Sequence, residues 1–237
     1  MKLLALDTAT EACSAALYID GEITQQYEIA PRKHSSLLLP MVDLLITEAN
    51  IQKRELDAIA FGRGPGSFMG VRIATGVAQG IAFALSLPVV PVSSLAAIAM
   101  VNHIETGATH TACGIDARMN ELYWGCYEIN EKSIPLLIGE EQVLPPQHIK
   151  LPEMGDDAGQ WSGAGTGWAS YREFIDSDVM DNLQAVYPEC LPSASAIATI
   201  AVSMFDNGQS VTAAQAVPVY LRNNVAKTTE EREQAKR

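Results

Sequence analysis

The chain has 237 residues, of which 48% are hydrophobic, and a formal net charge of −12, enough for one large or two modest domains with buried cores. The acidic charge argues against a large nucleic-acid-binding surface, because phosphate contacts come from clustered Lys and Arg. No apolar run reaches the roughly 18 residues that a membrane span needs, and no basic leader opens the sequence, so we expect a cytoplasmic protein with no membrane segment.

The first hundred residues alternate between apolar strands and helices. Strands are predicted at residues 2–7, 12–19, 22–29, 56–61 and 89–92, and helices at 35–49, 70–85 and 94–101. The Asp20-Gly21 pair between the second and third strands is a hairpin signal. Three strands followed by alternating helices and strands form the half-unit of the actin, Hsp70 and sugar-kinase (ASKHA) fold, a mixed β-sheet with flanking helices.

A second half of the same kind begins near Thr111. Asp7 and Asp116 each end an apolar strand and precede a polar turn, and they lie about half the chain apart. Glycines at 163–167 precede a helix, as the glycines before residue 70 do in the first half. These repeats predict a duplicated two-lobed α/β protein with ligand space between the lobes, and chance placement of the aspartates is the alternative. The expected divisions are an N-terminal lobe at 1–104, a degenerate C-terminal lobe at 105–222 and a flexible tail at 223–237.

The segment 61–72 holds four glycines and a proline between a strand and a long helix. Glycine lets another chain or a ligand approach the backbone, and a helix start with Arg72 nearby offers N–H groups to an anion. The spacing matches neither the phosphate loop nor the dinucleotide fingerprint. A ligand loop and a tight structural turn are therefore both open readings.

Four blocks give the chain a family resemblance: LALDTATEACSAAL, GRGPGSFMGVR, GIDARMNELYW and PVYLRNN. They resemble the TsaB (YeaZ) family of bacterial proteins needed for threonylcarbamoyladenosine in tRNA, and they follow the expected order from the first residues to Asn224. Family members usually have Thr where this chain has Met69, so a hydroxyl contact is lost there. The segment 133–192 matches least well, and no roles are carried into it.

The resemblance implies a scaffold or activator subunit. Such a subunit pairs with itself and, in exchange, with TsaD; the ATPase TsaE then joins the TsaB–TsaD complex. The complex transfers threonylcarbamoyl from its adenylate to N6 of the adenosine beside the anticodon. This chain would then contact tRNA only indirectly. It would need no cofactor of its own, although ATP or ADP could bind at the interface with the partner.

Eight residues are candidates for that nucleotide. The first polar turn and the glycine loop could surround a phosphate with hydroxyls and amides, and the second turn could bracket a nucleotide. The alternatives are ordinary turns and an ion pair between Asp116 and Arg118. Ala9 stands where phosphotransferases of this fold typically have Gly, which argues against catalysis. The candidates are Asp7, Thr8, Thr10, Gly64, Gly66, Ser67, Asp116 and Arg118.

Catalytic and metal motifs are missing from the sequence. The four histidines contain no i,i+4 pair of the kind that catalytic TsaD relatives carry. Ser67 follows Gly66 directly, so no nucleophile elbow is present, and the scattered cysteines are best read as buried thiols. We therefore predict no catalytic and no metal-binding residue.

Two helices predict a protein interface. In the helix at 70–85, small residues four apart would let another helix approach closely. In the helix at 35–49, apolar residues cover more of the circumference than one core contact needs. Packing on the sheet alone is the simpler reading. The predicted interface residues are Leu37, Leu38, Met41, Leu45, Arg72, Ile73, Gly76, Val77, Gly80 and Ala84.

The sequence thus predicts a two-lobed ASKHA protein that acts as a non-catalytic subunit. Two other classes remain open. An autonomous enzyme of the fold, a small-molecule kinase or a peptidase, predicts turnover that depends on Asp7 or Asp116. A plain homodimeric module predicts self-association without any partner.

Overall fold

The computed structural model describes residues 1–153 and 160–222, and the predicted tail at 223–237 lies outside them. The described chain forms two five-stranded mixed sheets. The first contains, in spatial order, β3 (Glu22–Ile29), β2 (Ala12–Ile19), β1 (Lys2–Asp7), β4 (Ala58–Gly62) and β5 (Val89–Val92). The second contains β10 (Leu183–Tyr187), β9 (Trp161–Ala164), β6 (His110–Asp116), β7 (Leu122–Ile129) and β8 (Pro135–Leu144).

The two sheets repeat one topology. In the first, β1 pairs antiparallel with β2 and parallel with β4. In the second, β6 pairs antiparallel with β7 and parallel with β9. Asp7 and Asp116 end the corresponding central strands β1 and β6. The predicted duplication and the two-lobed fold class are therefore confirmed.

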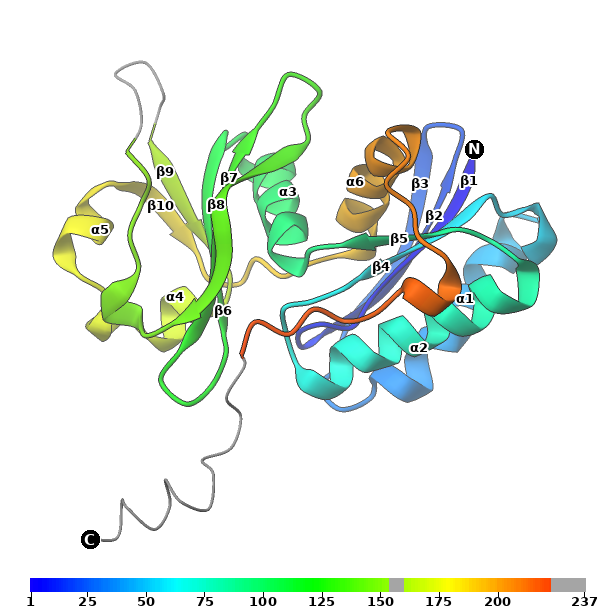
Figure 1. Cartoon of the computed structure of the whole chain (residues 1–237), viewed down its shortest axis with the longest axis horizontal. Coiled ribbons are helices and arrows are strands. Elements are labelled where there is room, and N and C mark those ends of the chain that lie inside the picture. The colour runs from blue at the N-terminus through cyan, green and yellow to red at the C-terminus, as the bar shows by residue number, and fades with distance from the viewer. Residues whose placement is uncertain (154–159, 223–237) are drawn as a thin grey trace, which may run out of the picture.

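The helices form three layers around the sheets (Figure 1). Helices α1 (His34–Glu48) and α2 (Phe68–Leu85) cover the outer face of the first sheet, and α3 (Ser94–Thr106) and α6 (Ala194–Asp206) lie between the two sheets. Helices α4 (Gly167–Ser170) and α5 (Ser177–Asp181) pack on the far side of the second sheet. Short 3₁₀ turns complete the chain at Lys53–Glu55, Pro146–His148, Arg172–Phe174 and Ala213–Gln215.

Strand β1 shows how the sequence places these layers. Successive side chains of a strand point to opposite faces. Leu4 and Leu6 accordingly pack under α1 and α2, whereas Leu3 and Ala5 pack toward α3 and α6. All four are fully buried, so β1 lies at the centre of the first half with helices on both faces.

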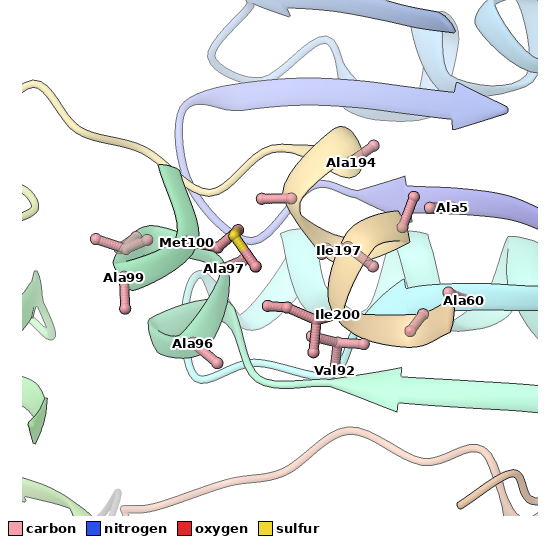
Figure 2. Packing of buried hydrophobic residues seen from close by; sticks show 14 of the residues in the cluster. Ala5, Ala60, Val92, Ala96, Ala97, Ala99, Met100, Ala194, Ile197 and Ile200 are labelled. Carbon is pink, nitrogen blue, oxygen red and sulfur yellow. The ribbon is translucent and has the colours of Figure 1, made fainter. Parts of the chain in front are cut away.

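Packing crosses the predicted division at residue 104. Helix α3 belongs to the first half by chain order but packs against β6 and β7 of the second sheet, and α6 belongs to the second half but packs on β1, β2 and β4. The two helices also contact each other and belong to one buried cluster, with Ala96, Ala97 and Met100 from α3 and Ala194, Ile197 and Ile200 from α6 (Figure 2). The lobes therefore share one central core.

Helix boundaries differ from the predicted ones for local reasons. Helix α2 begins at Phe68, because Ser67 is its N-cap and accepts a hydrogen bond from the N–H of Gly70. Helix α3 continues to Thr106, where Gly107 ends it with a left-handed backbone. Helix α2 also has the length and apolar composition of a membrane span. A core helix has the same properties, and α2 buries Ala74, Ala78 and Ala82 against the first sheet.

Candidate functional site

A cleft with a volume of about 790 Å³ lies between the two lobes. Five predicted nucleotide-binding residues line it: Thr10, Gly66, Ser67, Asp116 and Arg118. The other three, Asp7, Thr8 and Gly64, are buried beside it and are not part of its wall. The structure therefore brings most of the two polar turns and the glycine loop together, as the sequence predicted.

The glycine loop packs directly on the first polar turn. The N–H of Ser67 donates to the carbonyl of Ala9 at 2.7 Å. A Cβ at Gly66 would lie 2.4 Å from that carbonyl oxygen, closer than real Cβ contacts come. Gly66 is thus needed for contact between two parts of the chain, which favours the reading of this loop as a tight structural turn.

Thr8 and Thr10 use their hydroxyls inside the fold. The Thr8 hydroxyl donates to the carbonyl of Gly70 at 2.6 Å and accepts from the N–H of Ala74 at 3.1 Å. Thr8 therefore attaches the first turn of α2 to the end of β1. The Thr10 hydroxyl accepts from the N–H of Ala12 at 3.4 Å. The geometry does not support the prediction of Thr8 as a phosphate ligand, because its hydroxyl is fully buried and already paired.

Asp7 is sealed away from the cleft. Its side chain is fully buried; Oδ1 accepts from the N–H of Ala9 at 3.1 Å, and Oδ2 has no hydrogen-bond partner among the described residues. A Cβ at Gly62 would lie 1.9 Å from Oδ2, so only glycine fits beneath it. Burial raises the pKa of Asp7 to about 7. A carboxyl in this position cannot reach a metal ion or a substrate in the cleft without rearrangement of the fold.

Gly64 also has a structural role. It has a φ of +93°, its carbonyl accepts from the N–H of Ser94 at 3.0 Å, and a Cβ would lie 3.2 Å from the carbonyl oxygen of Val219. The neighbouring Arg63 carbonyl accepts from the N–H of Val219 at 2.8 Å. Gly64 thus allows the C-terminal segment to cross the glycine loop, and its prediction as a nucleotide ligand is not supported by the geometry.

The second polar turn is held by an ion pair. The Arg118 guanidinium donates to Asp116 Oδ2 at 2.9 Å, and the Arg118 N–H donates to Oδ1 at 2.7 Å. Tyr171 donates its hydroxyl to the same Oδ1 at 2.8 Å. Burial, together with this hydrogen bond, raises the pKa of Tyr171 to about 12. Asp116 therefore holds the turn in place. The structure contains the predicted ion pair between Asp116 and Arg118, which was the alternative to nucleotide binding.

The C-terminal segment 211–222 ties the lobes together. Residues near Val211 pair with β5, and the Gln79 side chain on α2 donates to the carbonyl of Ala216 at 2.8 Å. At its end, Arg222 donates to Glu121 at 3.0 Å and to the carbonyl of Arg118 at 3.2 Å, on the second lobe. No local sequence pattern marks the contacts of Arg222, because its partners lie about a hundred positions away in the chain.

The outer face of α1 and α2 has an exposed apolar surface, defined here as the α1/α2 face. Of the predicted interface residues, Arg72, Gly76, Gly80 and Ala84 are exposed, and Leu37, Met41, Ile73 and Val77 are half-buried. A Cβ at Gly76 or Gly80 would meet nothing within 4 Å, so the fold leaves this stripe uncovered. Helical spacing adds the exposed side chains of Leu44, Phe68, Met69 and Phe83 to this face, whereas exposed Leu39 lies on another side of α1.

The interface prediction is wrong for two residues. Leu38 and Leu45 are fully buried against the first sheet, so neither can present its side chain to a partner. The exposed leucines of α1 are Leu39 and Leu44. Leucines occur around most of this helix, and packing on the sheet determines which of them remain outside.

Arg72 is positioned by aromatic side chains. Its guanidinium carbon lies 3.6 Å from the centre of the Phe68 ring, within cation–π range. Its Nε donates to the hydroxyl of Tyr220 at 2.8 Å. Arg72 thus extends the α1/α2 face at the start of α2, beside the mouth of the interlobe cleft, which Phe68 lines.

The described residues contain no group of three or more His, Cys, Asp or Glu side chains arranged to hold a metal ion. The four cysteines are free and buried. Burial raises the pKa of Cys126 and of Cys190 to about 12, and a thiol is a weak nucleophile when it is protonated. These positions offer no reactive thiolate.

Comparison with known proteins identifies the family. The family model of TsaD, tRNA N6-adenosine threonylcarbamoyltransferase, matches residues 20–230. The tRNA threonylcarbamoyladenosine biosynthesis protein TsaB of Escherichia coli K12 is 40% identical over 95% of this chain and 96% of its own length. The Haemophilus influenzae protein of that name is 38% identical, over 95% of each chain. The chain belongs to the TsaB family.

A solved structure supports the same assignment. YeaZ from Pseudomonas aeruginosa superposes with a TM-score of 0.87 at 48% identity, covering 93% of this chain and 99% of that one. The resemblance stated from the four sequence blocks is confirmed, and with it the ASKHA-like fold. Membership of this family gives the protein a role in tRNA threonylcarbamoyladenosine biosynthesis.

Proposed function

We propose that this protein is a non-catalytic subunit that supports a TsaD-type transferase during threonylcarbamoyl transfer to tRNA. It pairs with TsaD through the α1/α2 face, and TsaE joins the resulting complex. In the absence of TsaD the same face forms a homodimer. Transfer of threonylcarbamoyl from its adenylate to N6 of the adenosine 3′ of the anticodon then takes place on the partner, in the cytoplasm.

The uncovered glycine stripe is the observation that carries this proposal. Gly76 and Gly80 are one helical turn apart on the exposed side of α2, and a Cβ at either position would meet nothing within 4 Å. Helices pack with their axes about 8–10 Å apart, and small residues at the crossing allow the closer distances. Phe83, three residues after Gly80 on the same helix and with 81% of its surface exposed, borders the stripe. Contiguous exposed apolar surface of this kind marks protein–protein interfaces.

The cleft geometry supports a non-catalytic role. Asp7 is sealed, Thr8 is fully paired, and the first turn is covered by the glycine loop. A nucleotide enclosed by this subunit alone would have to displace these contacts. We therefore place ATP or ADP at the mouth of the cleft near Ser67, between this subunit and TsaD, and assign tRNA binding to the partner because this chain is strongly acidic.

The test is a graded series at Gly80. Gly80→Ala adds one methyl group and should retain association, whereas Gly80→Leu should block close helix approach. Ser177→Leu introduces the same side chain at an exposed position on α5, on the second lobe, and serves as the control. Light scattering after size exclusion, with and without the TsaD of the same organism, reports the homodimer and the mixed complex.

The proposal predicts that the Gly80→Leu variant has the same unfolding temperature as the wild type. It should form neither the homodimer nor the complex with TsaD. The proposal also predicts loss of threonylcarbamoyl transfer to unmodified tRNA in the reconstituted system. A folded Gly80→Leu variant that still binds TsaD would contradict the assigned face. Transfer by this chain alone would contradict the non-catalytic role.

A further inference from the structure

A second cleft, with a volume of about 630 Å³, lies between α6, the start of α3 and the hairpin that joins β7 to β8. It shares no lining residue with the interlobe cleft described above. Figure 1 shows this hairpin beside α3 and α6, away from the α1/α2 face. None of its lining residues belongs to the surface assigned to a partner.

The wall of this second cleft is largely apolar. Ala96 on α3, Ile200 and Met204 on α6, and Ile134 and Leu136 on the hairpin contribute to it. Small-molecule sites are typically concave, of about 300–1,000 Å³, and combine apolar walls with a few fixed polar groups. The size and lining of this cleft fall within that class.

A buried polar cluster forms one end of the cleft. Glu141 on β8 has only 7% of its side chain exposed. Its Oε1 accepts from the hydroxyls of Ser93 and Tyr127, the latter at 2.5 Å, and its Oε2 accepts from Arg63 Nη2 at 3.2 Å. The carboxylate is thus fully engaged by protein donors. It fixes Arg63 in place instead of offering an acceptor to a ligand.

Arg63 retains free donors in this position. Its backbone is fixed on both sides, since its N–H donates to Val92 and its carbonyl accepts from Val219, both at 2.8 Å. Within the described residues, its Nε and Nη1 groups make no hydrogen bond and no ion pair. Asn130 uses its Oδ1 to accept from two backbone N–H groups of the hairpin, which leaves only its amide N–H groups for a ligand. Lys132 and Glu131, of opposite charge, both stand at the exposed rim, so Arg63 is the cation inside the cleft.

The cleft therefore combines apolar walls with the unpaired guanidinium edge of Arg63. A guanidinium offers paired N–H groups that match a carboxylate. Glu141, directly beside Arg63, would repel a doubly charged anion such as a phosphate monoester more strongly than a singly charged one. We propose that this cleft binds a small monocarboxylate with a short aliphatic tail. The carboxylate lies on the free edge of Arg63, and the tail lies against Ala96, Ile200 and Met204.

The probe for this test is hexanoate. Its binding to the full chain is monitored by protein-observed NMR titration. Hexanol has the same tail without the charge, and acetate has the charge without the tail. The proposal predicts saturable shifts for hexanoate at α3, α6 and the β7–β8 hairpin, with the two comparators at least about tenfold weaker. Equal binding of hexanoate and hexanol, or no saturable hexanoate binding, would overturn it.

Two variants locate the site. Arg63→Lys keeps the charge beside Glu141 but removes the free guanidinium edge, and Ser203→Phe on α6 fills the cleft from its wall. Each should weaken hexanoate binding by at least about tenfold. Arg54→Lys, at an exposed position on the 3₁₀ turn Lys53–Glu55, should leave it unchanged. Wild-type affinity in both cleft variants would refute the site, and neither variant touches the α1/α2 face.

Discussion

Burial of Asp7 makes a prediction about how stability depends on pH. Asp7 is fully buried with one oxygen unpaired, and burial raises its pKa from 3.8 to about 7. Between these two values the folded protein holds a proton that the unfolded chain has released. The free energy of unfolding contributed by Asp7 therefore falls as pH rises from about 4 to about 7 and is constant above that.

The size of the effect follows from the shift. At about 1.4 kcal/mol per pKa unit, a rise of roughly three units corresponds to about 4 kcal/mol between the two plateaus. Asp7→Asn removes the titration but keeps an oxygen for the N–H of Ala9. Its new amide N–H₂ group lacks a partner, which costs about 1–3 kcal/mol at every pH. The variant should be the less stable protein near pH 4.5 and should gain on the wild type by about 3 kcal/mol by pH 8, because roughly 1 kcal/mol of the difference is already lost at pH 4.5.

Urea unfolding followed by tryptophan fluorescence, from pH 4.5 to 8.5, measures this difference. Comparing wild type with Asp7→Asn at each pH cancels the titration of the other carboxylates. Asp181→Asn, at an exposed position on α5, controls for the loss of one acidic side chain. A difference between wild type and Asp7→Asn that is flat with pH, or that changes in the opposite direction, would refute the reasoning.

Two further predictions separate structural from interface residues. Thr8→Val removes the hydroxyl that joins β1 to α2 and leaves the N–H of Ala74 without its Thr8 acceptor, so unfolding free energy should fall by about 1–3 kcal/mol in urea titrations; unchanged stability would contradict the role of Thr8. Leu38→Ala should cost about 2–5 kcal/mol because its side chain is fully buried. Leu44→Ser, at an exposed position of α1, should leave the unfolding free energy unchanged but weaken association with TsaD, as measured by light scattering. If Leu38→Ala left the unfolding free energy unchanged and the variant of the exposed leucine lowered it, the orientation of α1 would be contradicted.

The sequence predicted the elements that have strong local patterns. Apolar strands ending in Asp7 and Asp116, and the glycine loop before a long helix, led to the correct duplicated fold. It did not predict which α1 leucines are buried, because apolar residues surround that helix and only the sheet beneath selects Leu38 and Leu45. Nor did it predict that the hydroxyl of Thr8 bonds to α2, since its partner Gly70 is 62 positions away. Contacts set by the tertiary fold have no local signal.

The links between the lobes favour the proposed use of the outer face over a closing cleft. Enzymes with two lobes commonly close around their substrate by hinge motion. Here α3 and α6 pack between both sheets, and charged contacts add cross-links at separate places: Arg63 with Glu141, and Arg222 with Glu121. Rotation of one lobe against the other would break these contacts together and expose the shared core. A fold held in this way presents a fixed outer surface, and a rigid surface associates at a lower entropic cost than one that must be ordered on binding.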